Sequence, residues 1–117
     1  MTLNRGDLFW AELKPRSGSE QKGRRPVVII SSDGFNHVSK WRSIIVIPVT
    51  TSSRQALRGP TVVAISGVGS VVSPNSMAVC HQITTIDRSK IKAQIGALSP
   101  VEMEGIEEGI RAACDLL

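Results

Sequence analysis

The stretch Gly18–Pro26 (Gly-Ser-Glu-Gln-Lys-Gly-Arg-Arg-Pro), followed at once by Val27–Ile30, predicts a charged loop that leads directly into a buried strand. Its two glycines permit backbone angles or close approaches that a side chain would forbid. Arg25 precedes Pro26, which biases Arg25 toward extended backbone. Its guanidinium is therefore expected at the mouth of the strand, where it is held better than at a loop tip.

Positive charge is concentrated around this stretch. Residues 14–25 carry the cations Lys14, Arg16, Lys22, Arg24 and Arg25 and the single acid Glu20, a local net charge of five minus one, or +4. The whole chain also carries +4, so its other residues sum to zero. A local cationic loop on a rigid strand suits a polyanion, although a solvated loop between strands has a similar composition.

Length and composition predict one globular domain over residues 1–117. Aromatic residues make up 3% and Tyr is absent, which argues against a sheet that stacks several RNA bases on aromatic side chains. Cys80 and Cys114 lie far apart and are expected to be small buried hydrophobes, with neither a zinc site nor a disulfide framework. No signal peptide or membrane span is recognisable, so we expect a cytoplasmic protein that does not enter a membrane.

The hydrophobic pattern predicts several short strands before a C-terminal helix. The expected strands cover residues 7–13, 27–32, 41–49, 61–65, 76–80 and 92–98, with a further short strand or turn at 83–87. Pro48 is expected at an edge or at a strand end, because it cannot donate to a central ladder. The fold class is mainly β: a small barrel or strongly curled sheet with one terminal helix.

The C-terminal helix has a clear start signal. Ser99 is expected at the N-cap, Pro100 at the first helical position and Glu102 at the third, which together form a capping box. Apolar residues then recur at alternating spacings of three and four, at Met103, Ile106, Ile110, Ala113 and Leu117. We expect this face to pack against the sheet.

The candidate chemical groups lie at predicted strand ends. No metal-ligand cluster, nucleophile elbow or phosphate-binding glycine motif is present in the sequence. There remain Glu20 and Arg25 at one loop–strand junction, Thr50 at a second strand end, and His81–Gln82 at a third. An arginine beside hydroxyl donors suits a phosphodiester under attack, and RNA carries its own nucleophile in the ribose 2′-hydroxyl.

Four blocks of sequence, in this order, resemble the MazF/PemK toxins of bacterial toxin–antitoxin pairs: Gly6–Trp10, Gly18–Val27, Val46–Thr51 and Gln82–Asp87. The resemblance runs from about residue 5 to the C-terminus, and its Gly-Ser-Glu-Gln-x-Gly-x-Arg-Pro block is specific. It implies an SH3-like barrel of the MazF/CcdB/Kid type with added helices. It also implies a homodimer and an antitoxin partner whose C-terminal segment covers the RNA groove.

The resemblance further implies a metal-independent endoribonuclease that needs no cofactor and cleaves single-stranded RNA at short recognition sequences. The expected products carry 2′,3′-cyclic phosphate and 5′-hydroxyl ends. The family's catalytic Arg and Thr fall on Arg25 and Thr50, and Glu20 is implicated in activity or in holding the arginine. The residues expected to contact RNA are Lys14, Arg16, Ser19, Gln21, Lys22, Arg24, Thr51, Arg54, Arg58 and Gln82.

One position departs from the family pattern. Many members have Asp before the Gln of the late block, where this chain has His81. An imidazole with a pKa near its unperturbed value of about 6.5 could transfer a proton. It could equally contact a base or be structural.

Two other functions remain open from the sequence. A toxin of the same fold could bind and inhibit DNA gyrase, as CcdB does, without using Glu20, Arg25 and Thr50. An RNA-binding barrel without turnover would also account for the basic loop.

Overall fold

The computed structural model describes residues 2–14, 23–51, 59–65 and 76–117. Its strands are β1 (Asp7–Leu13), β2 (Gly23–Ile29), β3 (Ser43–Thr50), β4 (Val62–Ala64), β5 (Met77–Val79), β6 (Thr84–Asp87) and β7 (Ile91–Ala97). Its helices are α1 (Asp33–Asn36) and α3 (Pro100–Cys114), with 3-10 turns η1 (Cys80–Gln82) and η2 (Arg88–Lys90).

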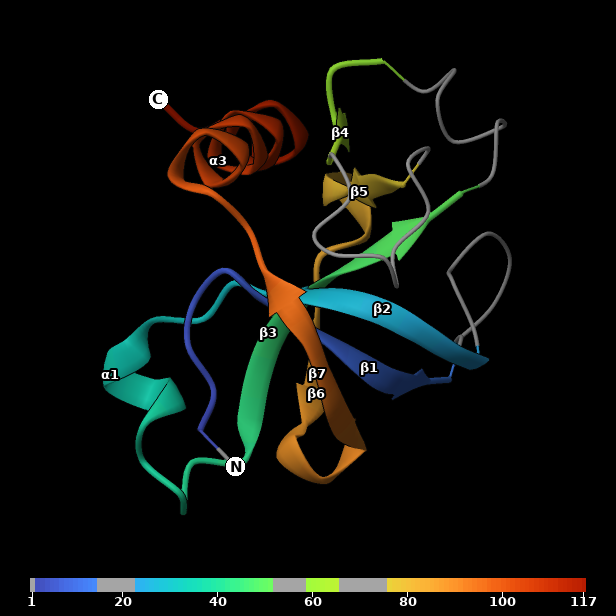
Figure 1. Cartoon of the computed structure of the whole chain (residues 1–117). Coiled ribbons are helices and arrows are strands. Elements are labelled where there is room, and N and C mark those ends of the chain that lie inside the picture. The colour runs from blue at the N-terminus through green and yellow to red at the C-terminus, as the bar shows by residue number, and fades with distance from the viewer. Residues whose placement is uncertain (1, 15–22, 52–58, 66–75) are drawn as a thin grey trace.

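The strands form one antiparallel sheet in the order β4-β5-β3-β2-β1-β7, and β6 also pairs with β3. The sheet curls, and α3 lies beside β4 and β5, on the opposite side of the molecule from the β6–β7 turn (Figure 1). This mainly β architecture with a C-terminal helix confirms the predicted fold class. Within the described ranges the sheet order ends at β4 and β7 without closing into a barrel.

Strand β2 begins earlier than the sequence pattern predicted. Arg24 and Arg25 were expected in a loop before a strand at 27–32, but the strand runs from Gly23 to Ile29. The reason is a long hairpin with β1, in which Leu13 pairs with Gly23 and Glu12 with Arg24. Both arginines therefore project from a paired strand, which restricts their backbones more than a loop would.

Pro48 corrects a second expectation, because it lies in the central strand β3. The Ile45 carbonyl accepts a hydrogen bond from Ile30 N and so faces β2. Backbone polar groups of successive strand residues point to opposite sides, so the nitrogen and carbonyl of Pro48 point away from β2, toward the side of β5 and β6. On that side β6 pairing stops at Val46 and β5 pairing starts at Val49, so the missing N–H falls where β3 changes partners.

The two faces of the sheet bury separate apolar clusters. One cluster is centred on Phe9, Val27 and Val46. The other lies under α3 and includes Leu8, Val28, Ile47 and Ile106, and Figure 1 shows α3 over that side of the sheet. Alternate residues of β1, β2 and β3 thus enter opposite clusters, which fixes the strand register because a one-residue slip would exchange the clusters.

The predicted helix start is confirmed. Ser99 Oγ accepts from Glu102 N, and the Glu102 carboxylate accepts from Ser99 N, which completes the capping box. The helix ends at Cys114 with Asp115 in the left-handed conformation. Leu117 therefore lies beyond the helix and is exposed, and Cys114 is exposed as well, so both were wrongly assigned to the buried face.

A close approach joins α3 to the sheet. A Cβ atom at Gly109 would lie 2.6 Å from Cys80 Sγ and 3.0 Å from Val63 Cγ2. The Cys80 thiol is buried against the helix, which raises its pKa to about 11. Gly109 thus permits a contact that the helical periodicity of the sequence did not indicate.

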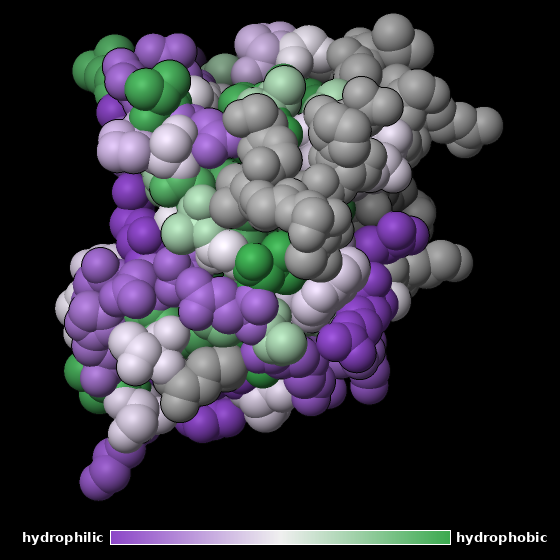
Figure 2. Space-filling model, in the orientation of Figure 1, coloured by the Kyte–Doolittle hydropathy of each residue, from purple (hydrophilic) through white to green (hydrophobic). Residues whose placement is uncertain are grey.

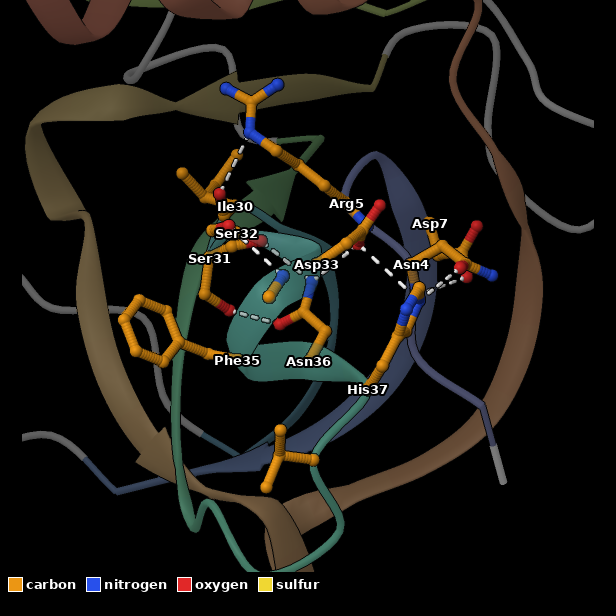
Figure 3. A network of polar contacts seen from close by, with 12 residues as sticks. Asn4, Arg5, Asp7, Ile30, Ser31, Ser32, Asp33, Phe35, Asn36 and His37 are labelled. Atoms are coloured by element: carbon orange, nitrogen blue, oxygen red, sulfur yellow. Dashed lines mark hydrogen bonds and ion pairs between the residues drawn. The ribbon is translucent and has the colours of Figure 1, made fainter.

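The N-terminal segment and α1 are tied by a polar network (Figure 3). Asp33 Oδ1 accepts from Arg5 N at 2.7 Å and from Asn36 Nδ2 at 3.0 Å. These bonds, led by the one from Arg5, lower the pKa of Asp33. His37 Nε2 lies 2.8 Å from Asn4 Oδ1, so this exposed imidazole has a structural contact.

No helix in the described part of the chain is both long enough and apolar enough to cross a membrane.

We predict that Gly109→Ala destabilises the fold although alanine favours helices by about 1 kcal/mol over glycine. The added methyl group overpacks against Cys80 and Val63, and such overpacking costs about 1–3 kcal/mol. The free energy of unfolding in urea would measure the change. Gly105→Ala is the matched control, because its Cβ would meet only a Val63 methyl, at 3.3 Å. Equal stability of the two variants would contradict this packing argument.

Candidate active site

The antiparallel register of β2 and β3 relates Arg25 to Thr50. Val28 pairs with Ile47 and Val27 with Pro48. Arg25 and Thr50 each lie two residues beyond the Val27–Pro48 pair, at which the described β2–β3 pairing ends. Opposite residues of an antiparallel pair project from the same face, and so do residues two apart along a strand. By this alternation Arg25 is on the same face of β2 as Val27, and Thr50 is on the same face of β3 as Pro48, the residue paired with Val27.

The two side chains differ in exposure. Arg25 is exposed, and its backbone pairs with Ala11 of β1. Thr50 is 6% exposed and pairs with Met77 of β5. Arg25 is thus flanked by β1, and Thr50 by β5, which restricts both backbones. A cation that solvent can reach beside a restrained hydroxyl can neutralise and orient a phosphate group.

Arg24 projects from the other face of β2. It is opposite Glu12 in the register, and its guanidinium carbon lies 5.5 Å from the ring centroid of Trp10. Hydrophilic residues gather over this end of β1 and β2, at the right of Figure 2. Lys14, at the end of β1, is also exposed. The positive side chains at this end of the hairpin are thus divided between its two faces.

His81 and Gln82 lie in η1, not at the end of a strand. The His81 Nδ1 atom is 2.7 Å from Thr61 Oγ1, and Cys80 N donates to the Thr61 carbonyl at 2.8 Å. Thr61 was not selected from the sequence, because nothing in its surroundings indicates a histidine 20 positions later. Met77, the partner of Thr50, precedes His81 by four residues, and β5 ends at Val79 before η1 begins. The β3–β5 register therefore does not place His81 beside Thr50.

Half of the candidate site lies outside the described residues. Glu20 is among these positions, together with the expected RNA contacts Arg16, Ser19, Gln21, Lys22, Arg54 and Arg58. Thr51 follows β3 directly and is exposed. In the described ranges, no three His, Cys, Asp or Glu side chains gather closely enough to hold a metal ion.

Comparison with protein families provides the deciding observation. Residues 4–114 match the model of the PemK-like, MazF-like toxin of type II toxin–antitoxin systems. The chain belongs to this toxin family. The resemblance seen in the sequence is thereby confirmed over nearly the whole chain.

Individual relatives agree with this assignment. A MazF-like relative, the endoribonuclease MazF of Staphylococcus saprophyticus, is 32% identical over 92% of this chain and 88% of its own length. A crystal structure of MazF from Deinococcus radiodurans has a TM-score of 0.80 at 22% identity, covering 99% of each chain. A mycobacterial endoribonuclease in complex with its cognate antitoxin has a TM-score of 0.76 at 20% identity, covering 98% and 97%. The two solved structures share the MazF-like fold with this chain.

We predict that Thr61→Val weakens the fold without changing its shape. The substitution removes the hydroxyl that lies 2.7 Å from His81 Nδ1, and one lost hydrogen bond costs about 1 kcal/mol. Urea unfolding of the single variants and of Thr61→Val/His81→Gln would give the coupling energy by a double-mutant cycle. Strict additivity of the two substitutions would contradict a direct interaction.

Proposed function

We propose that this MazF-like toxin is a metal-independent endoribonuclease that cleaves single-stranded RNA at short recognition sequences. The chain's enzyme class follows from its family and from its relative in Staphylococcus saprophyticus, which is named an endoribonuclease. The observation that supports the cleavage mechanism is the Val27–Pro48 pair, since Arg25 and Thr50 each lie two residues beyond it and alternation favours the same face for both side chains. We also propose that the toxin acts in the cytoplasm as a homodimer.

In the proposed reaction the ribose 2′-oxygen attacks the adjacent phosphorus atom. The new bond gives a 2′,3′-cyclic phosphate, while the bond from phosphorus to the 5′-oxygen breaks and that oxygen takes a proton. Negative charge builds up on the non-bridging oxygens, and the Arg25 guanidinium neutralises it. The Thr50 hydroxyl positions the same phosphate. Glu20 accepts the 2′-hydroxyl proton or orients Arg25, and Arg25 is the candidate donor to the leaving oxygen.

The loops and strand ends around Arg25 and Thr50, together with Arg24 on the other face of β2, supply the RNA contacts. Lys14, Arg24, Thr51 and Gln82 are the described members of this set. An antitoxin is the proposed protein partner. The mycobacterial structure with a bound antitoxin, which shares this fold, supports such a complex.

Removal of the Arg25 guanidinium tests the mechanism. Purified protein in EDTA should cut a long single-stranded RNA into discrete fragments, and their 5′ ends should accept phosphate from a polynucleotide kinase without prior dephosphorylation. We expect Arg25→Ala to lower the single-turnover rate by about 10²–10³-fold, the usual loss when one transition-state donor is removed. Thr50→Val should also slow cleavage.

Arg24→Ala is the matched control, because it removes the same charge from the adjacent residue on the opposite face. It should weaken RNA binding and leave the single-turnover rate at saturation close to that of the wild type. Equal losses in Arg24→Ala and Arg25→Ala would contradict a specific role for Arg25. Intact RNA with gyrase inhibition would instead indicate a gyrase-binding toxin, and intact but bound RNA a binding protein.

His81 is tested by the pH dependence of cleavage. His81 lies in η1 and is not paired with Thr50, whose partner in β5 is Met77, which supports a role in contacting RNA over one in proton transfer. We therefore expect His81→Gln to raise KM for RNA and to leave the pH profile of kcat unchanged. Loss of a titration near pH 6–7, the range of an unperturbed imidazole of about 6.5, would make His81 a proton-transfer group.

A further inference from the structure

Three exposed hydrophobic side chains lie together around α1 and the turn that follows it. Phe35 is 46% exposed, Val38 50% and Trp41 43%. The Phe35 and Trp41 rings stack with centroids 4.5 Å apart, and Trp41 N donates to the Val38 carbonyl at 2.9 Å. We call Phe35, Val38 and Trp41 the α1 patch. Figure 3 shows the Phe35 ring lying outside the polar network that holds α1.

The α1 patch is held rigid by one guanidinium. Arg88 Nε donates to the Trp41 carbonyl at 2.9 Å, and Arg88 Nη2 donates to the carbonyls of Asn36 and Val38 at 2.9 and 3.0 Å. Trp41 Nε1 donates to the Ser43 carbonyl at 2.7 Å. The backbone and the indole are thus fixed before any partner arrives. A surface ordered in advance loses little conformational entropy on binding.

The charge around the patch is positive. Lys40 and Arg42 flank Trp41 and are both exposed, and Lys90 follows Arg88 by two residues. The nearby acids are already engaged: Asp33 accepts from Arg5 N, and the Asp87 carboxylate lies 3.0 Å from Arg42 Nη2. The Arg42 contact lowers the pKa of Asp87, so Asp87 stays ionised and occupied by its own ion pair. Arg42 is engaged by the same ion pair, so exposed Lys40 is the cation next to Trp41 that a partner's carboxylate could meet.

The patch is remote from the candidate active site. Trp41 contacts the Ser43 end of β3, and Thr50 ends the same strand seven residues later, a distance of about 23 Å along an extended chain. A partner seated on the patch would not overlap Arg25. A single extended segment of roughly seven residues could nevertheless reach both places.

We propose that the α1 patch is a docking surface for an acidic amphipathic segment of the antitoxin, separate from the RNA-cleaving face. The inference rests on the proposed function for the existence of that partner. Apolar side chains of the segment cover Phe35, Val38 and Trp41, while a carboxylate of the segment faces Lys40. This combination of an apolar anchor and complementary charge is typical of groove-bound amphipathic segments.

The alternative occupants fit the surface less well. A second copy of the chain, related by a two-fold axis through the patch, would bring a second positively charged Lys40 to the patch and, among the described residues around it, no free carboxylate to meet it. The phosphates of an RNA would be attracted to the cations, but the Val38 side chain has no polar group for hydrogen bonds with RNA bases. In addition, the facing surfaces of the two aromatic rings are already covered by their mutual stacking. The acidic protein segment is the occupant that uses both the apolar surface and the charge.

Val38→Asp and Val101→Asp make a matched pair of variants for the test. Val101 is 77% exposed in the first turn of α3, so the same change is made at an exposed valine elsewhere. The probe is the protein encoded by the gene adjacent to that of the toxin, titrated into each purified toxin by calorimetry. We expect Val38→Asp to weaken binding by about tenfold or more, as for an anchor residue. Val101→Asp should bind within about twofold of the wild type.

Lys40→Glu is an independent test, because Lys40 lies at the edge of the α1 patch and its substitution leaves Phe35, Val38 and Trp41 unchanged. It should weaken the complex and reduce its dependence on salt concentration. All three variants should cleave RNA at the wild-type rate, so RNA cleavage tests the proposed function separately from this inference. Far-UV circular dichroism and thermal unfolding would establish that each variant is folded.

Four results would overturn the inference. Unchanged affinity of Val38→Asp and Lys40→Glu would mean that the antitoxin does not touch the patch. Conversion of a dimer to a monomer by Val38→Asp would assign the patch to a second copy. Impaired RNA cleavage or binding in both variants would assign it to RNA. No complex of the wild-type toxin with the probe, together with normal RNA cleavage, would remove the partner and leave the proposed function standing.

Discussion

The antiparallel pairing of β2 with β3 is the constraint on which the rest of the structure depends. It carries alternate residues of both strands into opposite apolar clusters, one under α3 and one on the other face. A slip of one residue would exchange the two sets between the clusters, so the packing of Val27, Val28, Val46 and Ile47 fixes the register. Arg25 and Thr50 each lie two residues beyond the Val27–Pro48 pair, so alternation favours the same face for both side chains. The hydrophobic effect therefore positions the polar groups that the proposed chemistry uses.

The sequence predicted those features that depend on local patterns. The strand at 7–13 and the capping box at Ser99 follow from alternation and from short-range hydrogen bonds, and both are confirmed. Features set by partners distant in sequence were missed. Pro48 occupies a central strand because β3 exchanges one neighbour for another, and Thr61 meets His81 through β-strand packing. Neither arrangement leaves a signal in the surrounding residues.

The candidate site shows the same division. The Gly18–Pro26 block was recognisable as a functional motif, but its arginines were placed in a loop, whereas pairing with β1 extends the strand through both. That pairing assigns Arg24 and Arg25 to opposite faces, a distinction that counting charge cannot make. The α1 patch also eluded sequence reasoning. Phe35, Val38 and Trp41 lie in α1 and the turn after it, and ring stacking together with the carbonyl contacts of Arg88 brings them into one surface.

The internal bonding of arginine has a consequence for nucleic-acid thermodynamics. Protein carbonyls or carboxylates already accept hydrogen bonds or ion pairs from the guanidinium groups of Arg5, Arg42 and Arg88. Positive side chains committed in this way displace fewer counterions from a single-stranded phosphate backbone, where each contacted phosphate normally contributes about 0.7 to the logarithmic salt slope. The slope of log RNA affinity against log salt concentration should therefore reflect mainly the cations of the β1–β2 hairpin. It should be smaller than the slope calculated from all Lys and Arg residues of the chain.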